Sequence, residues 1–128
     1  MAESFESLVV WQKAMQMVTQ VYEATKGFPR EEIFGLTSQM RRAAISVPAN
    51  IAEGKGRLTR ADYRHFLGTA RGSLLELRTH VQISQNLGYL RPAQATDLLK
   101  ASDTVGRLLN GLLSATPDSR RPKGAPNS

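Results

Sequence analysis

The chain of 128 residues contains no cysteine. This absence excludes disulfide bonds, thiolate nucleophiles and metal sites built on cysteine. Aromatic residues make up only 6% of the sequence, whereas residues that favour helices over sheets are abundant. No apolar run approaches the roughly 18 residues needed to cross a bilayer, and the first six residues are acidic where a signal peptide would be basic. We therefore expect a soluble, cytoplasmic, all-α protein.

The length of the chain supports one domain with a single core. We assign residues 1–115 to a helix-bundle domain. From residue 116 onward the sequence has no apolar side chain able to anchor it, and it carries Arg120, Arg121 and Lys123. This composition predicts a flexible basic tail over residues 116–128.

The positive charge of the protein is concentrated in one part of the sequence. The formal net charge is +6, and seven lysines or arginines stand between Arg41 and Arg71 against only Glu53 and Asp62. Such concentration favours a polyanionic partner, although a basic helical face is often only solvated surface.

The first helix is predicted over residues 8–26, where two apolar rows together cover about half of the circumference. Packing on a single core requires a stripe of only about 100°. One row contains Leu8, Trp11, Met15, Val18 and Tyr22, and the other contains Val10, Ala14, Met17 and Val21. The surplus apolar surface predicts self-association of the chain.

A second helix is predicted to begin near Pro29 and to bury an apolar row from Ile33 to Ile51, with spacings of three and four. Pro48 lies inside this row, where it lacks the amide that would donate to the carbonyl of Ala44. Because the apolar spacing resumes at Ile51, we expect a kink at Pro48 rather than a break.

A third helix is predicted to follow an N-cap at Thr59 and to keep a heptad spacing from Tyr63 to Ser84. Gly68 and Gly72 flank this row, and each costs up to about 1 kcal/mol of helix stability relative to alanine. We expect the close approach of another helix, or less readily of a ligand, to offset that cost.

A fourth helix completes the predicted domain. Gly88 is the expected left-handed residue that ends the third helix, and Pro92 opens the next, whose apolar row reaches Leu113. Four helices joined by short connections predict an all-α, antiparallel up-and-down four-helix bundle.

Glu53 and Glu76 are the carboxylates that an acid–base mechanism would use, but no other motif supplies a substrate cleft or tuned protonation. The structural interpretation is a polar network in which one or both bond to Arg41 or Arg42. In the same network Asn50 satisfies backbone groups freed by the proline inside the helix.

Neither a metal site nor a phosphate-binding loop is predicted. His65 and His80 stand about 22 Å apart along one helix, because each residue rises 1.5 Å. A metal held by Glu76 and His80 across a symmetry axis is the less favoured alternative to a surface or interface role. Residues 54–56 (GKG) lack the remaining frame of a phosphate-binding loop and are interpreted as a helix terminus. We expect no cofactor.

Several short sequence motifs follow one another between Phe5 and Leu90. They include residues 8–14 (LVVWQKA), 35–44 (GLTSQMRRAA), 46–54 (SVPANIAEG), 72–74 (GSL) and 87–89 (LGY). This order resembles the four-helix bundle proteins known as 23S ribosomal RNA intervening-sequence proteins. The resemblance implies an up-and-down bundle that assembles as a homopentamer, in a bacterial family without enzymatic activity. A related branch comprises accessory proteins of diversity-generating retroelements, where the basic pentamer binds nucleic acid and a reverse transcriptase.

The favoured hypothesis is a homo-oligomer that binds nucleic acid, RNA before DNA, without strong sequence specificity, because neither a base-reading helix nor an aromatic platform is evident. The candidate contacts are Arg41, Arg42, Lys55, Arg57, Arg60, Arg64 and Arg71. The alternative is a protein-interaction scaffold or an accessory subunit of a nucleic-acid enzyme such as a reverse transcriptase. An enzyme is the least favoured class.

Overall fold

The computed structural model describes residues 4–117. Most of the predicted basic tail, including Arg120, Arg121 and Lys123, therefore lies outside the described residues. The described chain consists of helices and their connections, without a strand. The helices are α1 (Val9–Thr25), α2 (Leu36–Lys55), α3 (Arg60–Asn86) and α4 (Pro92–Ser114), with short 3₁₀ turns η1 (Phe5–Ser7) and η2 (Arg30–Glu32).

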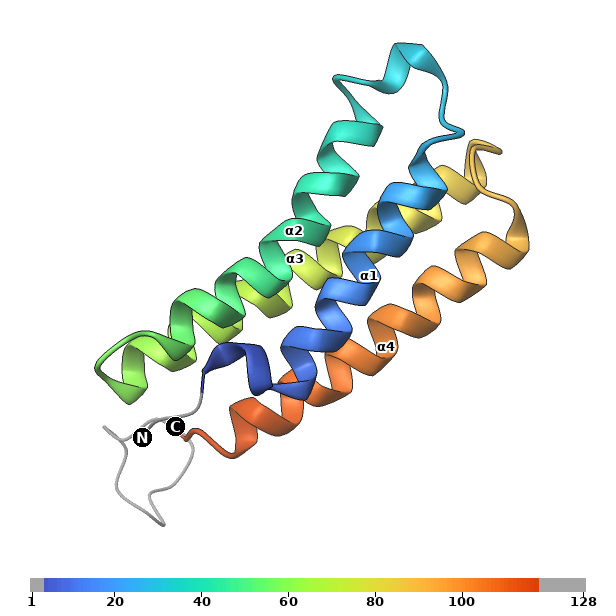
Figure 1. Cartoon of the computed structure of the whole chain (residues 1–128). Helices are drawn as coiled ribbons and strands as arrows, with labels where there is room; N and C mark the ends of the chain where they lie inside the picture. The colour runs from blue at the N-terminus through green and yellow to red at the C-terminus, as the bar shows by residue number, and fades with distance from the viewer. Residues whose placement is uncertain (1–3, 118–128) are drawn as a thin grey trace, which may run out of the picture.

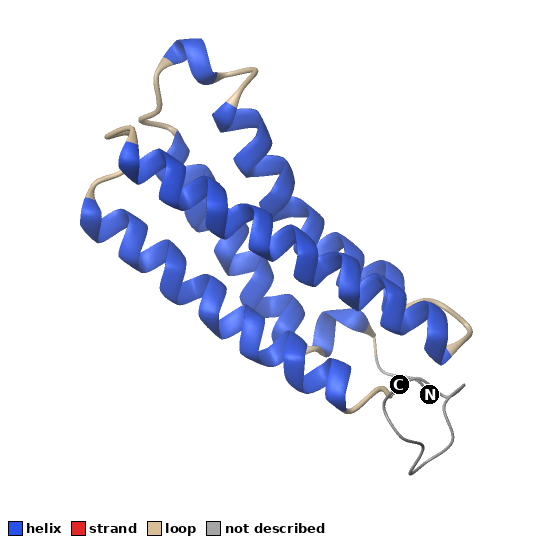
Figure 2. Cartoon of the chain, turned by 180° about the vertical axis from the view of Figure 1, so that it is seen from behind, coloured by secondary structure: helices blue, strands red, loops and turns tan. Residues whose placement is uncertain are grey.

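The four long helices lie side by side and run alternately up and down (Figure 1). Each packs on the next in sequence, and α4 returns to pack on α1, which closes the bundle. The view from behind shows the same arrangement, with connections only at the two ends (Figure 2). The prediction of an all-α, antiparallel four-helix bundle is confirmed. None of the described helices has the length and apolar character needed to cross a membrane.

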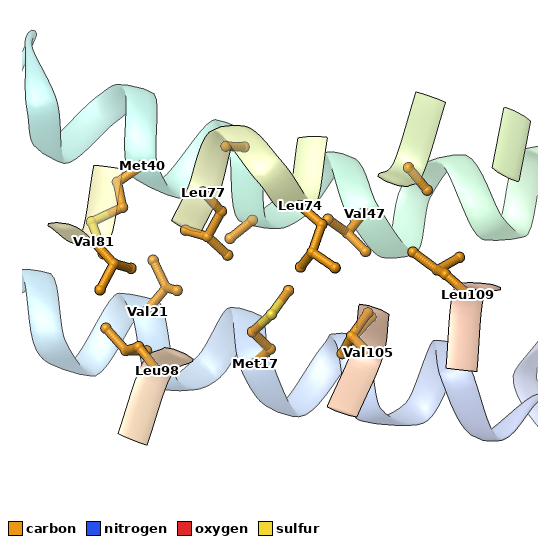
Figure 3. Close-up of a cluster of buried hydrophobic side chains, with 14 of the residues drawn as sticks. Met17, Val21, Met40, Val47, Leu74, Leu77, Val81, Leu98, Val105 and Leu109 are labelled. Atoms are coloured by element: carbon orange, nitrogen blue, oxygen red, sulfur yellow. The ribbon is translucent and has the colours of Figure 1, made fainter. Parts of the chain in front are cut away.

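All four helices contribute side chains to one continuous core (Figure 3). The central buried residues are Met17 and Val21 of α1, Met40 and Val47 of α2, Leu74, Leu77 and Val81 of α3, and Leu98, Val105 and Leu109 of α4. They fall at spacings of three, four or seven along each helix, so burial of these rows fixes how each helix is rotated in the bundle.

Three helix boundaries agree with the local sequence signals. The hydroxyl of Thr59 accepts from the amide of Asp62 at 3.1 Å and caps α3. Gly88 has φ of 77°, the left-handed conformation that ends α3, and α4 starts at Pro92.

The predicted start of the second helix near Pro29 is wrong. Residues 30–32 form only the turn η2, α2 begins at Leu36, and Ile33 is exposed instead of buried. Gly35, which precedes α2, has a non-helical backbone conformation. Glu32 accepts through Oε1 from the amide of Leu36, the first residue of α2, at 3.1 Å. Its Oε2 accepts from the hydroxyl of Tyr89 at 3.0 Å, which ties the α1–α2 connection to the α3–α4 turn. This hydrogen bond raises the pKa of Tyr89.

Helix α2 passes through Pro48 without interruption, and Pro48 is buried. The expected kink at this residue stays a prediction.

Gly54 marks a very close approach of α2 and α3. A β-carbon at this position would lie 2.8 Å from Cβ of Phe66 and 3.0 Å from Cδ1 of Tyr63, so something would have to shift. Gly68 and Gly72 differ, because a β-carbon at either meets nothing within 4 Å. Both glycines face outward from the bundle, so no helix of the described chain makes the expected close approach, and an approach by a helix or ligand from outside the chain stays a prediction.

Substituting Gly54 tests this close approach. We expect Gly54→Ala to lower the free energy of unfolding by about 1–3 kcal/mol, because the added methyl group has no space between α2 and α3. Gly68→Ala is the matched control and should raise stability by up to about 1 kcal/mol, since it improves helix propensity in open space. Urea unfolding at one fixed protein concentration measures both. Equal effects of the two substitutions would contradict the assigned packing.

Candidate nucleic-acid interface

The predicted contact residues fall into two groups once their partners are known. Arg42, Arg60 and Arg71 are exposed, and none has an ion pair or a side-chain hydrogen bond within residues 4–117. Lys55 is half-buried, with its Nζ 5.8 Å from the centroid of the Tyr63 ring. These four side chains leave their charge available to a ligand.

Arg41 is engaged inside the bundle. Its Nε donates to the hydroxyl of Thr25 at 2.8 Å, and its guanidinium carbon lies 4.4 Å from the centroid of the Tyr22 ring. Both partners belong to α1, so Arg41 links α2 to α1 through a hydrogen bond and a cation–π contact.

Arg64 is also engaged, at the end of α4. Its Nη1 donates to the carbonyl oxygens of Leu113 at 2.7 Å and Thr116 at 2.8 Å. A cation is favourable there because the last carbonyls of a helix carry partial negative charge. Thr116 is buried, so the described chain remains packed one residue beyond the predicted end of the bundle domain.

Arg57 forms a surface ion pair. Its Nη2 lies 2.7 Å from Oε1 of Glu53, one helical turn earlier, and its guanidinium carbon lies 4.7 Å from the centroid of the Phe66 ring. Both partners of the pair remain substantially exposed, and such pairs are worth only a few tenths of a kcal/mol. A phosphate can therefore compete with Glu53 for this guanidinium at little cost.

The predicted polar network of Asn50, Glu53 and Glu76 does not form as proposed. Within the described chain, neither Glu53 nor Glu76 pairs with Arg41 or Arg42, because both carboxylates point to solvent. Glu53 pairs with the arginine four residues later, and Oε1 of Glu76 lies 3.9 Å from Nε2 of His80. The predicted pairing was wrong because it assumed that these helix positions face the core.

Asn50 bonds locally. Its Nδ2 donates to the backbone carbonyl of Ser46 at 2.8 Å and to the hydroxyl of Ser46 at 2.9 Å. That hydroxyl lies 2.7 Å from the hydroxyl of Ser73, so the contact joins α2 to α3. The carbonyl that lacks a donor because of Pro48 belongs to Ala44, so the predicted role of Asn50 is wrong in its target.

The two histidines lie in different surroundings. His80 is buried, and its Nδ1 has no hydrogen-bond partner in the described residues. His65 is exposed and packs edge-on against Phe66 at 5.4 Å between ring centroids. Within residues 4–117 no group of three or more histidine, aspartate or glutamate side chains comes together as a metal site.

Two arginines near the predicted surface were missed by the sequence reasoning. Arg78 on α3 donates from Nη1 to the hydroxyl of Ser102 at 2.6 Å and pairs with the carboxylate of Asp103, both on α4. Arg107, on α4, lines a hollow between α3 and α4 that Arg78 also borders. A signal for Arg78 was present, because Arg64, Arg71 and Arg78 are spaced by seven residues and therefore lie along one edge of α3.

Two hollows lie on either side of helix α3, and each is lined by an arginine that the sequence predicted as a nucleic-acid contact. The hollow between α2 and α3 has a volume of about 410 Å³ and is lined by Gln39, Arg42, Ala43, Ser46, Ser73 and Glu76. The hollow between α3 and α4 has a volume of about 320 Å³ and includes Arg71. The structure thus places Arg42 and Arg71 on opposite sides of α3, and Lys55, Arg57 and Arg60 at the α2–α3 turn.

Fold and surface together define a basic four-helix bundle with exposed arginines on α2 and α3 that have no ion-pair partner in the described part of the chain. The family described as 23S rRNA-intervening sequence protein matches residues 6–111, and the chain belongs to this family. The resemblance that the sequence motifs suggested is confirmed to that extent, while the link to retroelement accessory proteins stays a prediction.

A solved structure supports the fold independently. The chain is similar to a crystallised protein of unknown function from the S23 ribosomal protein family of Bacteroides thetaiotaomicron, with a TM-score of 0.77 and 22% sequence identity. The match covers 82% of this chain and 98% of the other. A search of curated proteins found no match.

The different roles of two neighbouring cations can be tested on α3. Arg64→Gln should lower the free energy of unfolding by about 1–2 kcal/mol, because two carbonyls at the end of α4 lose a charged donor. Arg60→Gln, one turn earlier and without a partner in the described chain, should change stability by less than about 0.5 kcal/mol. Thermal unfolding followed by circular dichroism measures both. An Arg64→Gln variant with the same stability as the wild type would contradict the capping role.

Proposed function

We propose that this protein is a non-enzymatic, self-associating bundle that binds nucleic acid, with RNA as the favoured ligand. The observation that carries the proposal is that Arg42, Arg60 and Arg71 are exposed without a charged partner among the described residues. Lysines and arginines held in this way can neutralise phosphates and release their counterions on binding. Lys55 and the weakly paired Arg57 add charge at the α2–α3 turn.

The proposed contacts are of the kind that does not read sequence. They come from side chains spread over a turn and two helix flanks, and arginine and lysine contacts to phosphates carry no base information. The family name refers to an intervening sequence of 23S ribosomal RNA, which makes RNA the first polyanion to test.

Self-association is supported by the apolar row of α1 that runs from Leu8 to Tyr22. Tyr22 of this row is covered by Arg41, so the row faces the α2 side of the bundle. Burial there is incomplete, because Met15 is 42% exposed and Ile45 of α2 is 43% exposed. We propose that a second copy covers this face, and the expected stoichiometry remains the homopentamer that the family resemblance implies. Several copies would repeat each basic surface and raise the avidity for one polyanion.

A docking role for another protein is the second candidate. Phe34 is 96% exposed on the α1–α2 connection, next to the exposed Ile33, and Leu87 is exposed at the end of α3. The hydrogen bond between Tyr89 and Glu32 holds these two connections together at one end of the bundle. This apolar end lies opposite the α2–α3 turn (Figure 1), so a protein and a nucleic acid would not compete for one surface.

Salt dependence tests the nucleic-acid proposal. The full chain should bind single-stranded RNA at low salt, and the logarithm of the affinity should fall steeply and linearly with the logarithm of the salt concentration. Lys55→Gln combined with Arg60→Gln should make this slope shallower by about 1.4, because each lost phosphate contact on a single strand contributes about 0.7. Fluorescence anisotropy of a labelled oligonucleotide measures the slope. Absence of binding at low salt would remove this proposal and leave the docking role.

Sedimentation tests the assembly. The wild-type chain should sediment as an oligomer at micromolar concentration, and Met15→Glu should shift it towards the monomer, because a carboxylate would be buried in an apolar contact. Gln16→Glu is the matched control, since it adds the same charge to the next, exposed position of α1 and should leave the assembly unchanged. A folded monomeric wild type at micromolar concentration would contradict self-association.

A further inference from the structure

Three arginines along one edge of α3 have unequal roles. Arg64, Arg71 and Arg78 are about 10.5 Å apart from one to the next, because seven residues each rise 1.5 Å. The outer two are bound to α4, Arg64 at its last carbonyls and Arg78 at Ser102 and Asp103. Arg71, between them, has no such partner in the described residues and is exposed.

Arg71 borders the hollow of about 320 Å³ between α3 and α4. Gly106 of α4 packs against the buried Leu74 of α3, since a β-carbon on Gly106 would be 3.4 Å from Cδ2 of Leu74. Polar groups from both helices surround this apolar part, namely Arg71, Arg78, Ser102, Asp103, Arg107 and Asn110. Leu75, which is 54% exposed, adds an apolar wall.

The charges around this hollow do not balance. Asp103 is the only acidic side chain in its lining, and its carboxylate already pairs with Arg78. Arg71 from α3 and Arg107 from α4 have no ion-pair partner in the described chain. An anion in the hollow would therefore meet one free guanidinium from each helix, and the amide of Asn110 as a further donor.

We propose that the α3–α4 hollow binds a phosphate of a single nucleic-acid strand, held by Arg71, Arg107 and Asn110. This inference rests on the proposed function and extends it to a defined site. Guanidinium groups suit phosphate oxygens because they present several donors in one plane. Leu75 then contacts the sugar or an unstacked base of the same strand, a contact that a base-paired duplex does not offer.

The position of the hollow favours a polymer over a small anion. Arg60 lies eleven residues before Arg71, which is about 16 Å along α3. A strand of a few nucleotides can therefore contact Arg71 and Arg107 in the hollow and also reach Arg60 and Lys55 at the turn. An isolated phosphate or carboxylate group would occupy only one of these places.

The experiment compares two double variants of the full chain that remove equal charge. Arg71→Gln combined with Arg107→Gln should weaken binding of single-stranded RNA roughly tenfold at 0.15 M salt and make the salt slope shallower by about 0.7, because one phosphate contact is lost. Lys13→Gln combined with Arg30→Gln removes two exposed charges from α1 and η2 and should leave the affinity within about twofold. All four positions are exposed, and circular dichroism verifies that each variant is folded.

The outcomes separate this site from the general function. If the wild type binds RNA and both double variants bind equally well, the hollow is not the site, although the proposed function stands. If the wild type does not bind RNA at low salt, both proposals fall. A blunt RNA duplex should lose less affinity than the single strand when Arg71 and Arg107 are replaced, and an equal loss would overturn the single-strand assignment. If replacing Arg71 and Arg107 lowered the affinity for polyglutamate as much as the affinity for RNA, the assignment of the site to nucleic acid would be overturned.

Discussion

The close packing of α2 on α3 is the constraint on which the rest of the structure depends. Gly54 leaves no space for even a methyl group against Tyr63 and Phe66. The backbone of α2 therefore packs directly on side chains of α3 near the turn that joins the two helices. Further along, the hydroxyls of Ser46 and Ser73 meet at 2.7 Å and fix the register. With this pair fixed, α1 and α4 have only the remaining apolar faces to cover. The basic side chains are consequently left on the turn and on the outer flanks of α3.

Periodicity was sufficient to predict the helices because a buried row must repeat every three or four residues whatever it packs against. The heptad row of α3 predicted from Tyr63 to Ser84 is buried from Leu67 onward, and Tyr63 at its start is half-buried. The start of α2 could not be predicted in the same way, because it involves a hydrogen bond from the amide of Leu36 to the side chain of Glu32. Tyr89 holds that glutamate from a position 57 residues later in the chain. A local pattern of proline and acidic residues does not contain this information.

The candidate site was less predictable than the fold for a related physical reason. Sequence shows where charges are, but the partner of each charge is decided by tertiary packing. Arg41 and Arg42 are neighbours in the sequence, yet one contacts Tyr22 and Thr25 while the other faces solvent. Glu53 and Glu76 were expected to neutralise these arginines, but Glu53 pairs with Arg57, and Glu76 forms no ion pair with Arg42 although both line the α2–α3 hollow. The net charge of the segment could therefore be read from the sequence, whereas the partner of each charged residue could not.

The three arginines spaced by seven residues on α3 differ in the partners that α4 offers them. A cation at either end of the edge finds acceptors on α4, since the last carbonyls lie opposite Arg64 and Asp103 lies opposite Arg78. Opposite Arg71, α4 presents Gly106, Arg107 and Asn110, none of which is an anion. The same spacing that fastens two helices together thus leaves its middle member without an anionic partner among the described residues. Because an exposed arginine can gain more from a phosphate than from water, this gap in charge compensation is what supports the proposed phosphate contact at Arg71.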